Sequence, residues 1–70
     1  MSKMIDIILN GKMRTIPEGS TLQTLIESLG FDAATLVIEL NELVVDKKTV
    51  CTTRIQAHDK VEVLQFVGGG

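Results

Sequence analysis

The sequence predicts an α+β fold in which one main helix packs across a mixed sheet of four to five strands. The periodicity of the apolar residues changes twice, from strand-like to helical and back. A chain of 70 residues has room for one small domain, and it contains no internal repeat or linker. We therefore expect a single domain over residues 1–67, followed by a flexible glycine tail at 68–70.

The first element is a predicted hairpin. Two β-rich runs, residues 4–9 and 12–16, flank Asn10-Gly11, a pair that suits the positive φ angles of a tight turn. A two-residue loop places Ile7 opposite Arg14, so Arg14 must reach the rim of the core face. That face is expected to carry Ile5, Ile7 and Ile16.

The stretch STLQTLIESLG then predicts an amphipathic helix over about residues 21–29. Ser20 with Gln23 matches a capping box at its start, and Gly30 suits a left-handed residue after its end. The apolar stripe that should face the sheet is Leu22, Leu25, Ile26 and Leu29.

Strand character returns after the helix. Residues 36–40 form a predicted strand, residues 43–45 a short one, and residues 61–67 the last. No regular element is predicted between 46 and 57. The order β-β-α-β-β-β places the first and last strands side by side and parallel in the middle of the sheet.

Composition excludes several classes of function. The net charge is −2 and the basic residues have no aromatic residues interleaved among them, which argues against binding of nucleic acid. No apolar run approaches the ~20 residues of a membrane span, and the start of the chain lacks the pattern of a secretory signal. A single cysteine cannot form an internal disulfide, so a reducing cytoplasm is expected.

Individual reactive residues give no catalytic constellation. Cys51 could carry a persulfide, but a free cysteine more often behaves as a small buried hydrophobe, and we expect that role. His58 has no second histidine or cysteine cluster beside it, so it is interpreted as a solvated turn residue and no metal site is expected. Without a nucleophile, base and orienting group, the chain is not expected to be an enzyme.

The last strand has two faces and leads into the glycines. Val61 and Val63 should face the helix, whereas Leu64 and Phe66 share the solvent side with Glu62. An exposed aromatic residue just before the tail is a candidate anchor for a partner protein. In the alternative interpretation the sheet curls and Phe66 covers the edge of the core.

Four stretches, LNGK, STLQTLIESLG, VIELNELVV and above all VEVLQFVGGG, resemble the ThiS family of sulfur carriers in thiamine biosynthesis, which has the ubiquitin-like β-grasp fold. The resemblance covers nearly the whole chain. It implies that the carboxylate of Gly70 is adenylated by a ThiF-like partner enzyme that uses MgATP, while this chain binds no cofactor itself.

The resemblance also implies the later steps. Sulfur from a persulfide enzyme replaces AMP to give a thiocarboxylate, which a ThiG-like thiazole synthase then uses. Gly69 and Gly70 are the expected reactive end, because residues without Cβ atoms can lie extended in a narrow channel. The expected partner-binding residues are Gly68, Val67, Phe66 and Leu64.

Other functions stay open at this point. The small subunit of molybdopterin synthase is a carrier of the same fold that also ends in two glycines. A protein modifier would instead join Gly70 to a lysine through an isopeptide bond. A plain interaction module would carry the glycines as an inert tail.

Overall fold

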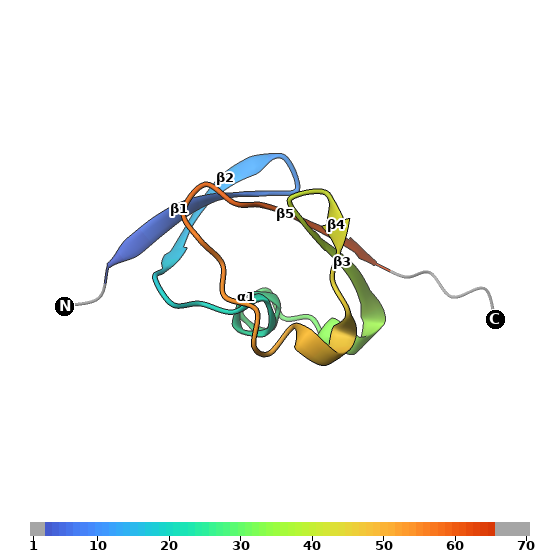
Figure 1. Ribbon diagram of the computed structural model, residues 1–70. Helices are drawn as coiled ribbons and strands as arrows, with labels where there is room; N and C mark the ends of the chain where they lie inside the picture. The colour runs from blue at the N-terminus through green and yellow to red at the C-terminus, as the bar shows by residue number, and fades with distance from the viewer. Residues whose placement is uncertain (1–2, 66–70) are drawn as a thin grey trace.

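The computed structural model describes residues 3–65 of the chain. In this range, α1 packs against one face of a five-stranded sheet, confirming the predicted α+β fold (Figure 1). The strand order is β2-β1-β5-β3-β4, with β1 and β5 parallel and the other pairs antiparallel. The elements are β1 (Met4–Leu9), β2 (Lys12–Pro17), α1 (Leu22–Ser28), η1 (Ala33–Thr35), β3 (Leu36–Leu40), β4 (Leu43–Val44), η2 (Lys47–Thr49) and β5 (Lys60–Gln65).

The hairpin of β1 and β2 has the predicted register. Ile5 lies opposite Ile16, and Ile7 lies opposite Arg14, whose side chain is exposed. The turn residues Asn10 and Gly11 have φ angles of 49° and 80°, the left-handed conformation that this pair adopts readily. β2 extends one residue further than predicted, to Pro17, because proline is compatible with the end of an edge strand.

Helix α1 spans Leu22–Ser28 rather than about 21–29 as predicted, and its N-cap, Thr21, lies one residue later than predicted. The capping box predicted at Ser20 and Gln23 is wrong: Thr21 Oγ1 accepts from the backbone amide of Thr24, and Thr24 Oγ1 accepts from the amide of Thr21. Ser20 Oγ instead donates to the carbonyl oxygen of Pro17 at 2.6 Å, which holds it in the preceding turn. Gly30 has a φ of 84°, as the predicted left-handed ending requires.

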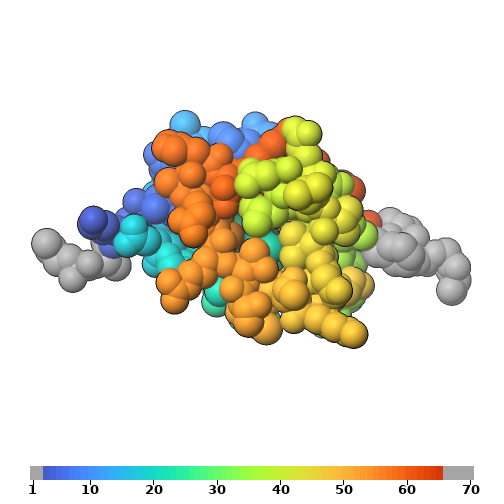
Figure 2. Space-filling view, in the orientation of Figure 1, coloured from blue at the N-terminus to red at the C-terminus, as the bar shows by residue number. Residues whose placement is uncertain are grey.

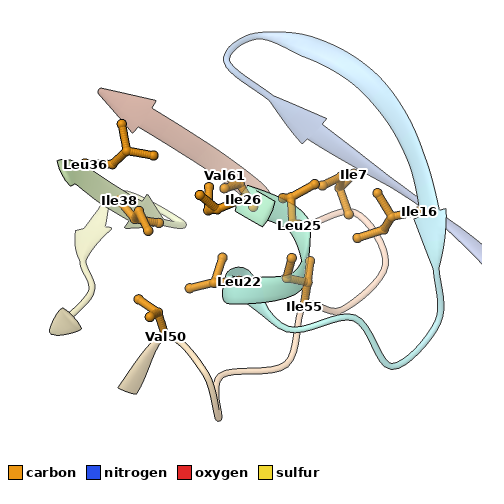
Figure 3. Close-up of a cluster of buried hydrophobic side chains, with 10 residues drawn as sticks. All are labelled: Ile7, Ile16, Leu22, Leu25, Ile26, Leu36, Ile38, Val50, Ile55 and Val61. Atoms are coloured by element: carbon orange, nitrogen blue, oxygen red, sulfur yellow. The ribbon is translucent and has the colours of Figure 1, made fainter. Parts of the chain in front are cut away.

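The helix stripe meets the sheet in one core. Leu22, Leu25 and Ile26 are buried, and Leu29 packs against them from the end of the helix. These positions lie at helical spacing, so one side of α1 covers the inner face of the sheet (Figure 3). The buried set is Ile7, Ile16, Leu22, Leu25, Ile26, Leu36, Ile38, Val50, Ile55 and Val61.

Residues 46–57, for which no regular element is predicted, cover the core at the start of the helix. The backbone amides of Leu22 and Gln23 donate to the carbonyls of Thr53 and Val50, so this segment satisfies the free amides at the start of α1. Figure 2 shows the connection from β4 to β5, yellow to orange, forming much of the visible face.

The expectation that Cys51 is buried is wrong. Val50 takes the core position with 5% of its surface exposed, and the adjacent Cys51 is exposed on the turn that follows. Neighbouring residues in a tight turn point in different directions, so only one of the two can enter the core. The exposed thiol is therefore not needed for packing.

β1 and β3 have the predicted bounds, whereas two other strand boundaries differ from the prediction by one residue. β4 ends at Val44 rather than at residue 45, and β5 begins at Lys60 rather than at residue 61. Lys60 is tied into the sheet because its amide donates to Asn41 Oδ1 at 2.9 Å while its carbonyl accepts from the Asn41 amide at 2.7 Å. The helix found within residues 3–65 is too short to cross a membrane.

Candidate partner-binding face

The predicted site begins on β5, the central strand of the sheet, and only its first residue can be placed. Leu64 is 53% exposed, which confirms that its side chain points away from the core. Val61 is fully buried and Val63 partly so, as predicted for the face toward the helix. The other site residues, Phe66, Val67, Gly68, Gly69 and Gly70, lie outside the described residues.

Hydrogen bonds from both sides hold β5 in place. On one side it pairs with β3 from Val61 to Gln65, and on the other side it pairs with the end of β1. Where β1 turns away, Asn10 continues the pairing: its backbone amide donates to the carbonyl of Val61, and its Oδ1 accepts from the amide of Val63 at 2.8 Å. The strand that leads to the predicted tail is thus fixed as far as Val63 on both edges.

Leu64 belongs to the face of the sheet opposite α1, here called the outer face. Its cross-strand neighbour is Val37 on β3, which is half-buried, and together they form an apolar spot near the end of β5. No other element covers this face in the part of the chain that the structure describes (Figure 1). An exposed apolar spot on a regular sheet is suited to contact with another protein.

Charge lies next to this apolar spot. Glu62 stands directly opposite Glu39, and two like charges in this position repel one another. Lys60 offsets part of the repulsion, because its Nζ lies 3.8 Å from Glu62 Oε1 and 3.5 Å from Glu42 Oε1. The pair of carboxylates on one row of the sheet favours a partner that presents a basic group beside an apolar one.

Sequence reasoning identified Leu64 but missed its surroundings. Val37 and Val44 share the outer face, as do Ile8 and Met13 of the hairpin, which lie opposite one another. The signal was available for the hairpin, since the residues that alternate with the predicted core positions must point outward. It was also available for β3, because Glu39 marks the solvent side of this strand and Val37, two residues away, lies on the same face.

The described residues offer no site for a metal, since no group of three histidine, cysteine or carboxylate side chains among residues 3–65 is arranged to hold an ion. His58 is exposed in the turn before β5 with a φ of 71°, as expected for a solvated turn residue. Cys51 lies on the turn after η2.

A mixed sheet with its first and last strands parallel at the centre, covered by one helix, defines the ubiquitin-like class of β-grasp proteins. Comparison with solved structures supports the assignment to this class. The crystal structure of the thiamine biosynthesis protein ThiS from Geobacter metallireducens superposes with a TM-score of 0.82 and 30% sequence identity, over 94% of this chain and 100% of that one. A solution structure of a thiamine biosynthesis protein from the same organism gives a TM-score of 0.78.

Sequence comparison identifies the family within this class. A sequence model of the ThiS family matches residues 7–70, and the chain belongs to that family. It is 34% identical over 70 residues to uncharacterized protein ycf40 of Porphyra purpurea, covering 99% of that protein. It is also 38% identical over 64 residues to a thiazole synthase of Magnetococcus marinus, of which it spans 20% of the length.

Proposed function

We propose that this chain is a sulfur carrier in thiamine biosynthesis, on which partner enzymes act at the carboxylate of Gly70. The observation that carries the proposal is the family match, which runs through the three glycines to residue 70. The fold shared with the Geobacter metallireducens ThiS supports it. The chain is then a protein co-substrate, with residues 1–67 as the domain that partners recognise and 68–70 as the tail that they act on.

The chemistry explains why an activating partner is needed. A carboxylate is a poor acyl electrophile because oxide is a bad leaving group. A ThiF-like enzyme that uses MgATP would convert the Gly70 carboxylate into an acyl adenylate and release pyrophosphate. The terminal sulfur of a persulfide on the donor enzyme would then attack the acyl carbon and displace AMP, giving an acyl disulfide. A second thiol would cleave its S–S bond, forming a disulfide with the donor cysteine and releasing a thiocarboxylate, whose sulfur is a soft and strong nucleophile.

The acceptor of this sulfur is proposed to be a ThiG-like thiazole synthase. Two relatives support that choice: the Magnetococcus marinus thiazole synthase and one from Paramagnetospirillum magneticum, which is 30% identical over 64 residues. In each, the matched region makes up 20% of a longer chain. A carrier-like region inside such a chain is expected where carrier and synthase must meet repeatedly, because linkage raises their effective concentration.

In this proposal the outer face docks onto the partner enzyme, and the tail enters its active site. Leu64 and its neighbour Val37 provide an apolar contact on a strand held on both edges, so docking fixes the position from which the tail starts. Phe66 and Val67 would extend that contact. Gly68, Gly69 and Gly70 would enter the active site, where each ordered residue costs roughly 1–2 kcal/mol of backbone entropy that the docking contact must offset.

The test is conversion of the terminal carboxylate. The chain is incubated with the adenylating enzyme, MgATP, a persulfide donor and a thiol that reduces the acyl disulfide, and its intact mass is measured for replacement of one oxygen by sulfur. Fragmentation of the C-terminal peptide should place the sulfur on Gly70. Omission of MgATP should abolish the change, because the carboxylate is then not activated.

One control is essential, because adding an oxygen changes the mass almost as much as replacing oxygen by sulfur. The chain has three methionines and an exposed cysteine that can oxidise. The Cys51→Ser variant removes the thiol, so a thiol-alkylating reagent that still modifies this variant reports the thiocarboxylate alone. An unmodified Gly70 in a reaction that does consume ATP would contradict the proposal.

A further inference from the structure

A groove of about 350 Å³ lies between the tip of the β1–β2 hairpin and the residues that follow α1. Its floor is apolar, and Phe31 stands at its side with 49% of its surface exposed. Burying such an aromatic side chain against a ligand is favourable, and the packing of the described fold does not do so. The lining residues that matter here are Leu9, Lys12, Met13, Arg14, Leu29 and Phe31.

The groove runs along β2, an edge strand with an open backbone. Asp6, Ile8 and Asn10 direct their backbone hydrogen bonds toward β5 and the turn before it. Along an antiparallel strand, successive residues point their backbone N–H and C=O groups toward opposite neighbouring strands. Ile5, Ile7 and Leu9 therefore bond to β2. On β2, the backbone groups of Met13 and Thr15 therefore point away from the sheet, where no strand among residues 3–65 pairs with them.

The charges beside this edge have one sign. Lys12 and Arg14 are the charged residues that line the groove, and they project from the same face of β2, about 7 Å apart along the strand. Both are exposed, and neither forms an ion pair within the described residues. The groove thus combines an apolar floor, two cations and four free backbone groups.

We propose that this groove binds an extended, acidic segment of a partner protein, which adds a sixth strand to the sheet next to β2. The backbone of the segment would pair with Met13 and Thr15, an apolar side chain would contact Phe31, and flanking carboxylates would reach Lys12 and Arg14. None of these residues is among those proposed for sulfur transfer, so the site is a second interface on the carrier.

The same features select against the simplest competing occupant, a second copy of this chain. Inward-pointing cations on an edge strand repel an identical edge, and this is a known way to prevent self-association of sheets. They attract an acidic strand instead, so the edge discriminates between itself and a partner. A purely protective edge would not require a half-exposed aromatic residue and an apolar floor behind its charges.

The experiment uses the full chain labelled with nitrogen-15 and a peptide of three central valines flanked on each side by glutamates, with blocked termini. We expect the peptide to shift the amide signals of Met13 and Thr15 in a saturable way. Lys12→Glu with Arg14→Glu should weaken binding about tenfold or more. Lys48→Glu, an exposed cation on η2, is the matched control and should leave binding unchanged.

Two further variants test the strand addition itself. Thr15→Pro removes an amide that points outward, and edge strands tolerate proline at such positions, so the fold should survive. It should weaken binding about fivefold, whereas Thr15→Ala, which keeps the amide, should not. The proposal is overturned if the peptide gives no shifts at about 1 mM, if Thr15→Pro binds like the parent, or if an oligonucleotide shifts the same amides more strongly than the peptide.

Discussion

The side chain of Asn10 bonds to the backbone of Val63, with 2.8 Å between Asn10 Oδ1 and the Val63 nitrogen. These residues are 53 positions apart in the sequence, and the bond lies where β1 has already turned away from β5. A turn residue thereby extends the pairing of the central strand toward its exposed end. Asn10 thus has two tasks, since it also supplies the left-handed conformation of the hairpin turn.

Replacing Asn10 should separate these two tasks. Asn10→Gly keeps the positive φ but leaves the Val63 amide without its partner, so we expect a loss of about 1 kcal/mol in the free energy of unfolding. Asn10→Asp keeps both an acceptor and a residue that tolerates this conformation, and should be close to the parent. Urea unfolding measures the difference, and equal stability of Asn10→Gly and the parent would show that the bond contributes nothing.

The loop from residue 46 to 57 can be tested at two adjacent positions. Val50→Ala removes buried methyl groups and should lower the free energy of unfolding by about 2 kcal/mol, from lost burial and the cavity left behind. Cys51→Ala changes an exposed side chain and should stay within ~0.5 kcal/mol of the parent. Thermal or urea unfolding of the two variants compares them directly, and the reverse order would place the cysteine in the core.

The outer face can be tested with two apolar residues of equal exposure. Leu64 is 53% exposed beside the proposed docking spot, and Met4 is 54% exposed at the other end of the sheet. We expect Leu64→Ala to weaken binding to the adenylating enzyme by ~1 kcal/mol or more, since it removes a central contact. Met4→Ala should leave the affinity unchanged.

Calorimetric titration of both variants with the enzyme gives the two affinities. Each variant should unfold within ~0.5 kcal/mol of the parent, because both side chains are exposed. Equal losses of affinity for Leu64→Ala and Met4→Ala would show that the apolar spot at the end of β5 does not direct docking.

Most of the fold was predictable because local signals agreed with one another. The Asn10-Gly11 pair fixed the loop length, and the loop length then fixed the register of Ile7 against Arg14. The helix stripe was correct because its apolar residues recur at helical spacing. The capping box was displaced by one residue because Ser20 and Thr21 are both good caps, and only the hydrogen bond from Ser20 to Pro17 decides between them.

The parts that could not be predicted depend on contacts distant in sequence. Residues 46–57 have no periodicity, and they are held against α1 by contacts distant in sequence, such as the bond from the Gln23 amide to the carbonyl of the buried Val50. At the site, the position of Val37 beside Leu64 depends on how β3 pairs with β5, which the sequence of β3 alone does not reveal.

The terminal glycine should separate function from stability. Gly70 lies beyond all strands and helices that the structure describes, so its deletion should change the free energy of unfolding by no more than ~0.5 kcal/mol. The deletion nevertheless withdraws the reacting carboxylate by about 3.5 Å of extended chain, where a displacement of ~1 Å can lower a rate about a hundredfold. Adding an alanine after Gly70 should have the same effect, because it displaces the carboxylate and brings a Cβ atom into the channel. Exchange of labelled pyrophosphate into ATP by the adenylating enzyme measures this step, and near-normal exchange with both variants would exclude Gly70 as the site of activation.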